Sequence, residues 1–237
     1  MNDLDFFLII IYLTCISYVL LQMISALFIE QVEITFDKQD LQNQLELQLL
    51  KEVISIEFKM KPRYDRSALP SNVDIIIKNI SQHQWIYLEW DYSCLISVDG
   101  ESKRLVRVPP GSTFDLLPPQ MFTVLSPGTR FKEKLSSEAA LTRDPETGTL
   151  KLDGALINLA RLNKDKRRRK RFMRLSILLK EPAKFYIRLL LRIEDKSQGN
   201  SKIAFYTINN LFVVKKVHWV QQLPWNVPRP KPEDLKL

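Results

Sequence analysis

The N-terminus opens with an uninterrupted apolar run. Residues 6–29, FFLIIIYLTCISYVLLQMISALFI, contain no charged residue and no proline. About 20 such residues cross the hydrocarbon core of a bilayer as a helix, so the pattern predicts a transmembrane helix over 6–29. Gln22 and Ser25 are polar positions within the run. Because polar side chains in lipid pair with neighbouring helices, they are the candidate membrane-helix contacts.

A cleaved signal peptide is the alternative for this segment. A signal peptide has a basic start, a shorter apolar stretch and a small-x-small cleavage site. Here the start is MNDLD, which carries two acids and no base, and no convincing cleavage site follows Ala26. We therefore expect a retained, single-pass membrane anchor.

The flanking charges bear on orientation. No Lys or Arg precedes the apolar run, and within about a dozen residues after it the only one is Lys38. The positive-inside rule then favours the large C-terminal domain on the cytoplasmic side of the membrane.

Beyond the anchor, apolar residues alternate with polar ones. In ISIEFKMK they fall at 54, 56, 58 and 60, which is the period of a half-buried strand. Aromatic and β-branched runs bounded by Asp-Gly, Pro-Pro-Gly and Pro-Gly continue the pattern. The expected strands are 54–61, 73–81, 84–100, 104–112, 120–129, 173–179, 184–193, 201–208 and 211–219. This series predicts a mainly β protein, an antiparallel β-sandwich over 30–222.

Two of these segments suggest a more specific fold. VDIIIKNIS (73–81), followed by WIYLEWDYSCLI (85–96), resembles the paired early strands of immunoglobulin-like accessory domains. The resemblance implies an immunoglobulin-like β-sandwich. It assigns no binding or catalytic residue, because function belongs to sites and not to folds.

Three segments do not follow the strand pattern. LQNQLELQLLKEV (41–53) reads as a strand or as a short helix. GALINLARLNK (154–164) has helical spacing, with Asp153 as a candidate N-cap. The tail, 223–237, is rich in proline and is expected to be extended.

Charge is concentrated in one place. The chain has 237 residues and a net charge of +8, and the segment 164–174 alone holds eight cations and one acid. The rest of the protein is therefore close to neutral, which argues against a generally basic nucleic-acid-binding fold. The candidate residues for binding anions or lipid headgroups are Lys164, Lys166, Arg167, Arg168, Arg169, Lys170, Arg171 and Arg174.

This basic insertion, near 154–174, has two interpretations. A domain tethered to a bilayer meets anionic headgroups at high local concentration, and each cation near the surface gains about 1 kcal/mol. The other interpretation is a solvated loop. Nucleic acid is not an expected partner, because Phe172 is the single aromatic residue available for base stacking.

Catalytic and metal-binding motifs are scarce. The two histidines, His83 and His218, have no second ligand at a useful spacing, and Cys15 and Cys94 suit neither a disulfide nor a zinc site. We expect no cofactor, no metal and no enzymatic activity. The remaining enzymatic alternative is an acid pair in a hydrolase or transferase, formed by Glu89 and Asp91 on one face of a strand.

These observations predict a non-enzymatic, single-pass membrane protein. It would serve as an accessory or assembly subunit that binds a larger membrane complex through its helix and β domain. The alternative is an anionic lipid- or nucleic-acid-binding module acting through 164–174. Tryptophan is favoured at interfaces, although it is also common in cores. The candidates for partner contact are Trp85, Trp90, Trp219 and Trp225.

Overall fold

The computed structural model describes residues 3–28, 31–108, 120–157, 159, 182–195, 202–223 and 226. Its helices are α1 (Asp3–Phe28), α2 (Lys38–Leu47) and the 3₁₀ turns η1 (Glu138–Ala140) and η2 (Trp219–Gln222). Its strands are β1 (Gln31–Phe36), β2 (Ile54–Lys59), β3 (Arg63–Asp65), β4 (Val73–Asn79), β5 (Gln84–Ile96), β6 (Ser102–Arg107), β7 (Thr123–Leu125), β8 (Arg130–Ser137), β9 (Leu141–Arg143), β10 (Leu150–Leu152), β11 (Ala183–Asp195) and β12 (Lys202–Lys216). The segments 173–179, most of 158–181 and most of the tail lie outside the described residues.

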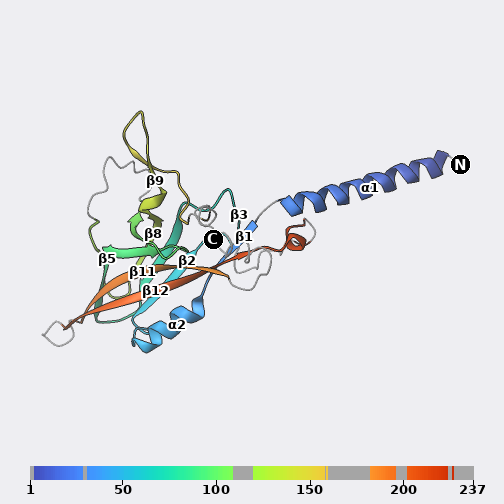
Figure 1. The fold of residues 1–237 in the computed structure, drawn as a ribbon. Coiled ribbons are helices and arrows are strands. Elements are labelled where there is room, and N and C mark those ends of the chain that lie inside the picture. Colours follow the sequence, from blue (N-terminus) through green and yellow to red (C-terminus); the bar gives the residue numbers. More distant parts are fainter. Residues whose placement is uncertain are drawn as a thin grey trace.

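Ten strands form one curled antiparallel sheet in the order β2-β4-β8-β6-β5-β11-β12-β1-β3, with β7 beside β5 (Figure 1). Strand β6 joins the two halves of this sheet. Its first residues pair with the end of β5, and its last residues, Leu105–Arg107, pair with Leu135–Ser137 of β8. The halves therefore curl toward each other as a half-barrel while remaining hydrogen-bonded together.

The prediction of a mainly β, antiparallel fold after an N-terminal apolar helix is confirmed. The expected sandwich of two separate sheets is not what the structure shows, because β6 pairs with both β5 and β8. The strand pattern along the chain reports alternation but not which strands share hydrogen bonds.

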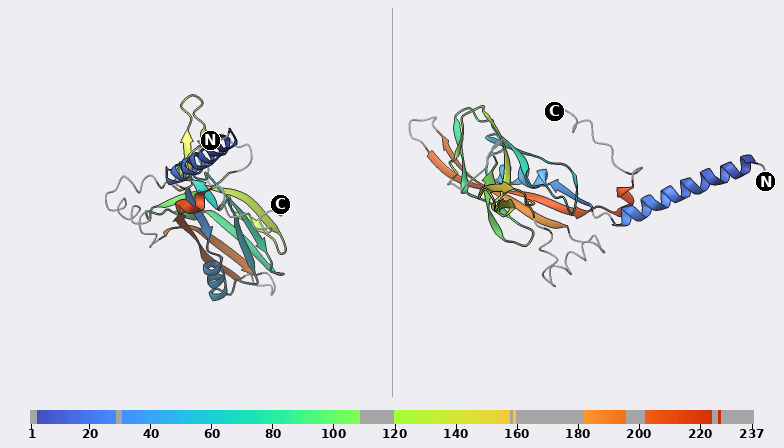
Figure 2. Two further views of the ribbon diagram at one scale, coloured as in Figure 1. Left: turned by 90° about the vertical axis from the view of Figure 1, so that its right-hand side faces the viewer. Right: turned by 90° about the horizontal axis from the view of Figure 1, so that it is seen from above.

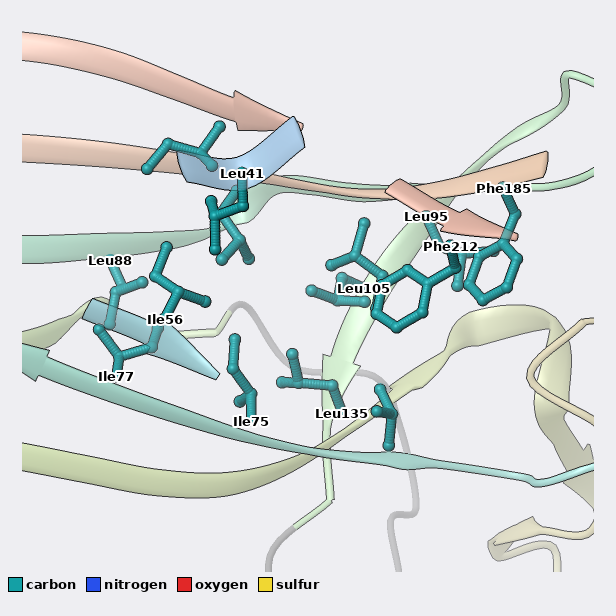
Figure 3. Close-up of a cluster of buried hydrophobic side chains, with 14 of the residues drawn as sticks. Leu41, Ile56, Ile75, Ile77, Leu88, Leu95, Leu105, Leu135, Phe185 and Phe212 are labelled. Carbon is teal, nitrogen blue, oxygen red and sulfur yellow. The ribbon is translucent and has the colours of Figure 1, made fainter. Parts of the chain in front are cut away.

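The core fills the concave side of the curl (Figure 3). Ile75, Ile77 and Leu135 come from one half and meet Leu88 and other side chains from the opposite half. Four phenylalanines pack at the end of the sheet nearest α1: Phe36, Phe58, Phe185 and Phe212. The Phe185 and Phe212 rings stack with centroids 4.7 Å apart, and Phe58 meets Phe212 edge-on at 5.1 Å.

The ambiguous segment 41–53 begins as helix α2. Asp37 caps it, accepting hydrogen bonds from the backbone N–H groups of Gln39 and Asp40 at 3.1 and 3.0 Å. Leu41 and Leu45, four residues apart, are buried. Leu47 and Leu49, which the strand interpretation places in line with Leu45, are instead 85% and 87% exposed.

The two segments predicted as separate strands, 201–208 and 211–219, form the single strand β12. The intervening Asn209-Asn210 pair does not turn the chain, because both side chains are used in the sheet. The Asn210 amide donates to the Ile187 carbonyl at 3.0 Å, and Asn209 Oδ1 accepts from Arg188 Nε at 2.7 Å.

The predicted helix over 154–164 is not seen where the structure describes this segment. Residues 154–157 and 159 are not helical, although Leu156, Ile157 and Leu159 are buried. Gly154 lies so close to η1 that an added Cβ would sit 2.8 Å from the Ala140 Cα. Close backbone contact with η1, and not helix formation, fixes the start of this segment.

Helix α1 extends away from the sheet (Figure 2). Its apolar span, Asp5–Ser25, is 21 residues long, and none of its residues is fully buried by the rest of the molecule. By length and composition it suits either a membrane anchor or a signal sequence. Strand β1 starts beside it at Gln31, so we call this end of the sheet proximal. The end where β11 finishes and β12 begins is distal (Figure 1).

Candidate interaction surface

Aromatic and apolar side chains gather on the outer, convex side of the sheet at its distal end. They alternate along their strands with buried residues such as Ile86, Leu88, Leu191 and Ile193, so they point away from the core. We call this group the distal aromatic face. Its members are Trp85, Tyr87, Phe122, Val124, Arg192, Glu194, Ile203 and Phe205.

Strand register brings these residues together from distant parts of the chain. Arg192 of β11 lies between Tyr87 of β5 and Phe205 of β12. Tyr87 in turn lies opposite Val124 of β7. Directly opposed residues in antiparallel strands have their Cβ atoms about 5 Å apart, so the four strands present one continuous surface.

Arg192 is the centre of this face. Its guanidinium carbon lies 4.2 Å from the Tyr87 ring centroid and 5.6 Å from that of Phe122, and the two rings are 5.8 Å apart. Its Nε is 3.4 Å from Glu89 Oε1, an ion-pair contact and not an aligned hydrogen bond. Stacking and ion pairing hold the guanidinium in one place, which lowers the entropy lost when a partner binds it.

A second polar contact fixes the Tyr87 ring. The Tyr87 hydroxyl donates to Glu194 Oε2 at 2.9 Å. Partial burial, followed by this hydrogen bond, raises the pKa of the Tyr87 hydroxyl above its ordinary value. Tyr87 is therefore a neutral, oriented donor at neutral pH.

The outermost members are strongly exposed. Val124, Phe122, Ile203 and Phe205 are 43%, 45%, 53% and 64% exposed. Single exposed apolar residues are ordinary, but a contiguous group around a fixed arginine has the composition of protein–protein interfaces. The arrangement suits binding of a protein surface.

The face ends at an open edge of β12. Helix α2 covers this edge further along: Gln48 Nε2 donates to the Thr207 carbonyl at 3.2 Å, and the Gln44 side chain bonds both the N–H and the C=O of Asn209. Beyond Thr207, toward the distal end, no strand or helix of the described chain pairs with Ile203 or Phe205 on this side. Their backbone groups are available to an added strand.

A wide bulge in β5 lies beside the face. Cys94 pairs with Arg188 and Glu89 with Leu190, so residues 90–93 of β5 stand opposite the single residue Leu189. Ser93 closes the gap, since its hydroxyl donates to the Glu89 carbonyl at 2.7 Å and accepts from the Leu190 N–H at 3.2 Å. The bulge redirects β5 from β7 to β6.

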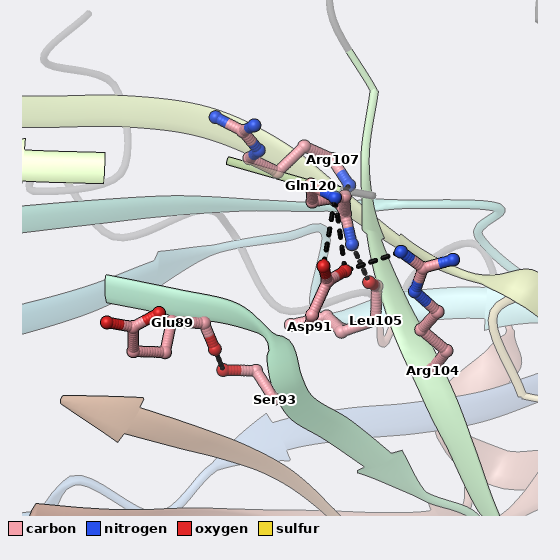
Figure 4. Close-up of polar contacts among 7 residues, drawn as sticks. All are labelled: Glu89, Asp91, Ser93, Arg104, Leu105, Arg107 and Gln120. Atoms are coloured by element: carbon pink, nitrogen blue, oxygen red, sulfur yellow. Dashed lines mark hydrogen bonds and ion pairs between the residues drawn. The ribbon is translucent and has the colours of Figure 1, made fainter. Parts of the chain in front are cut away.

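Asp91 projects from this bulge into a polar network (Figure 4). It pairs with Arg104 and accepts from the Gln120 N–H at 3.1 Å. Burial alone would raise the pKa of the Asp91 carboxyl, but the hydrogen bonds from Arg104 and Gln120 outweigh it and lower that pKa. Asp91 thus remains an ionised structural group that joins β5 to β6.

The two carboxylates of the proposed acid pair, Glu89 and Asp91, contact different partners. The alternation that would place both carboxylates side by side is interrupted by the bulge between them. Glu89 faces Arg192, whereas Asp91 faces Arg104 and Gln120 (Figure 4). Each carboxylate is held by an arginine, which does not suit a general acid.

The candidate tryptophans divide between core and surface. Trp90 is 1% exposed, and its Nε1 donates to Thr123 Oγ1 at 2.8 Å. Trp85 is half-buried on the distal aromatic face. The Trp219 side chain and Trp225 lie outside the described residues.

The other predicted site residues are not part of this surface. The basic run, Lys164 to Arg174, lies wholly outside the described residues. In α1, Gln22 is half-buried and Ser25 is exposed. Neither side chain makes a hydrogen bond within the described part of the chain.

The sequence interpretation missed Arg192, Phe122 and Phe205 as members of one site. The available signal was the outward phase of KFYIRLLLRI and SKIAFYTI, where Arg192 and Phe205 occupy solvent-facing positions. Only the register shows that they are neighbours. No known protein family, no characterised protein and no solved structure shows significant similarity to this chain.

Proposed function

We propose that this protein is a non-enzymatic, single-pass membrane protein that binds a partner protein through its β domain, as an accessory or assembly subunit of a larger membrane complex. The observation that carries the proposal is the distal aromatic face, with its fixed Arg192 and exposed Phe205. Tyrosine, tryptophan and arginine are enriched among the hot spots of protein interfaces.

The anchor in this proposal is α1. Its 26 residues correspond to about 39 Å at 1.5 Å per residue, against a hydrocarbon thickness of about 30 Å. The acidic start and the length of the apolar run favour retention over cleavage. Gln22 and Ser25 would then face a neighbouring helix of the complex, and the β domain would lie on the cytoplasmic side.

The position of the face suits such a role. Phe205 is separated from the proximal end of β12 at Lys216 by roughly 35 Å of strand, at about 3.3 Å per residue. The distal end therefore reaches away from the bilayer toward the soluble part of a partner.

The second candidate function remains an anionic lipid- or nucleic-acid-binding module acting through Lys164 to Arg174. Eight cations in eleven residues favour it. Its signature would be binding that weakens steeply with salt and is lost when that run is neutralised.

The test is co-purification from the source membranes in mild detergent. The Phe205→Glu variant puts a charge into the face beside Arg192, at a position exposed enough to leave folding intact. The matched control, Arg143→Glu, puts the same residue on an exposed position of β9. We expect Phe205→Glu to lower recovery of the partner at least tenfold, and Arg143→Glu to leave it unchanged. Equal recovery with both variants would refute the proposal.

A further inference from the structure

A charged surface lies on the outer side of the sheet, on the half that does not carry the distal aromatic face. It is formed by the edge strand β2, its neighbour β4, and β8 on the other side of β4. Outward positions on these three strands line a hollow of about 360 Å³. Its lining is Ser55, Glu57, Lys59, Ile76, Lys78, Arg130 and Lys132. Four cations and one carboxylate therefore meet here.

The placement of these cations is electrostatically unfavourable by itself. Lys78 lies directly opposite Arg130, and Lys132 lies one outward position further along β8. Like charges directly opposed across a sheet destabilise it. Among the described residues, no carboxylate forms an ion pair with Lys78, Arg130 or Lys132.

Charges on an edge strand also serve to prevent sheet-to-sheet aggregation. That role explains Lys59 on β2, the strand at the open edge. It does not explain Lys78, which lies on β4 between β2 and β8. Arg130 lies on the part of β8 that β6 does not pair with, directly opposite Lys78. A guanidinium placed beside an inner lysine fits the requirements of an anion instead.

We propose that this hollow binds a phosphate-type oxyanion carrying two or more negative charges. The Ser55 hydroxyl lies in the same cross-strand row as Lys78 and Arg130 and supplies a neutral donor. A guanidinium binds phosphate oxygens in a bidentate manner, and lysines add point charges. The excess of positive charge matches an anion with more than one charge.

The expected source of the phosphate group is a soluble compound and not a lipid headgroup. Lys78 adjoins Asn79, whose amide donates to the carbonyls of Gln84 and Leu125 at the distal end of the sheet. If α1 is retained as an anchor, this end lies away from its bilayer. The site is separate from the distal aromatic face, and its anion binding does not depend on partner binding there.

Titration calorimetry tests the proposal with inorganic pyrophosphate as the probe and the full chain in neutral detergent. The site variant is Lys78→Gln/Arg130→Gln/Lys132→Gln. The matched control, Arg143→Gln/Lys184→Gln/Lys215→Gln, removes the same charge at exposed positions outside the hollow. We expect the site variant to weaken pyrophosphate binding at least tenfold and the control to change it less than threefold.

Equal weakening by both variants would show that only bulk charge matters, and unchanged binding by the site variant would place the anion elsewhere. Either result overturns the proposal. A second titration uses short-chain phosphatidic acid in the same detergent, and binding of this lipid without pyrophosphate binding would overturn the soluble source. The Phe205→Glu variant should bind pyrophosphate as the native protein does. A failure of the partner-binding proposal can therefore be told apart from a failure of the anion-binding proposal.

Discussion

The Ser93 side chain maintains the shape of the bulge in β5, beside the distal aromatic face. It is 2% exposed and replaces two ladder bonds that the bulge in β5 removes. Without its hydroxyl, the Leu190 N–H and the Glu89 carbonyl would be left without that partner. Buried polar groups without partners cost about 1–3 kcal/mol each.

We therefore predict that Ser93→Ala lowers the free energy of unfolding by about 1–3 kcal/mol. Denaturant unfolding of the full chain in detergent, followed by tryptophan fluorescence, measures this. The control is Ser102→Ala, at an exposed position at the start of β6. A Ser93→Ala protein as stable as the control would show that the serine does not hold the bulge.

At the residue scale, the contacts of Arg192 were not predictable from the sequence. Its outward phase in KFYIRLLLRI follows from alternation, but its neighbours depend on which strands pair and in which register. The same holds for Lys78 and Arg130, which lie on separate strands and become neighbours only through the β4–β8 ladder.

At the element scale, α2 acts as a cover for the edge of β12. Gln44 holds the N–H and C=O of Asn209 at 3.0 and 2.7 Å, in the place that a neighbouring strand would take. Open strand edges invite pairing with other chains. The helix therefore confines the open part of the edge to the distal end.

We predict that Gln44→Ala reduces stability by about 1–2 kcal/mol, since it removes hydrogen bonds to the β12 backbone. It should also cause concentration-dependent self-association, because the Asn209 N–H and C=O then join the open backbone groups of Ile203 and Phe205. Sedimentation velocity and denaturant unfolding measure the two effects. Gln42→Ala, on an exposed position of the same helix, should leave both unchanged, and a monomeric Gln44→Ala protein of native stability would contradict this account.

The β9–β10 hairpin carries a pH-dependent contact. Asp144 pairs with Lys151 and accepts from the Glu146 N–H at 2.9 Å. The hydrogen bond from Lys151, followed by that from Glu146, lowers the pKa of the Asp144 carboxyl from 3.8 to about 2. Because the folded value is the lower one, the contact contributes stability above the unfolded pKa of 3.8 and loses it as the pH falls toward about 2.

A carboxyl-detected NMR titration of the native protein should therefore show Asp144 titrating with a midpoint of about 2. The Lys151→Gln variant should move that midpoint upward, toward the ordinary value for aspartate. A midpoint that is the same in both proteins would mean that Lys151 does not hold the carboxylate.

Elements with clear alternation were predictable, and those fixed by tertiary contacts were not. The strands at 54–61, 73–81 and 84–100 follow their apolar pattern. For 41–53 the spacing of the leucines fits both the two-residue period of a strand and the period of a helix. The segment begins as a helix because this conformation packs both Leu41 and Leu45 against the sheet. The turn-prone Asn209-Asn210 pair is absorbed into β12 because side-chain hydrogen bonds use it within the ladder.

At the scale of the whole molecule, helix α1 and the distal end of the sheet, where β11 finishes and β12 begins, lie at opposite ends (Figures 1 and 2). The apolar helix was evident from length and composition alone. The closure of the sheet through β6 was not, because alternation gives the buried side of each strand but not its partners. The basic run lies outside the described residues, so its role stays a prediction.

Site-specific photocrosslinking in intact source membranes tests the central claim, that a membrane-anchored domain binds a partner through its distal face. A photoreactive residue replaces Phe205 in one protein and Arg143 in another. We predict one discrete protein adduct from position 205 that stays in the membrane pellet after alkaline extraction, and no such adduct from position 143. Identical patterns from both positions, or release of the protein by alkali, would contradict the account.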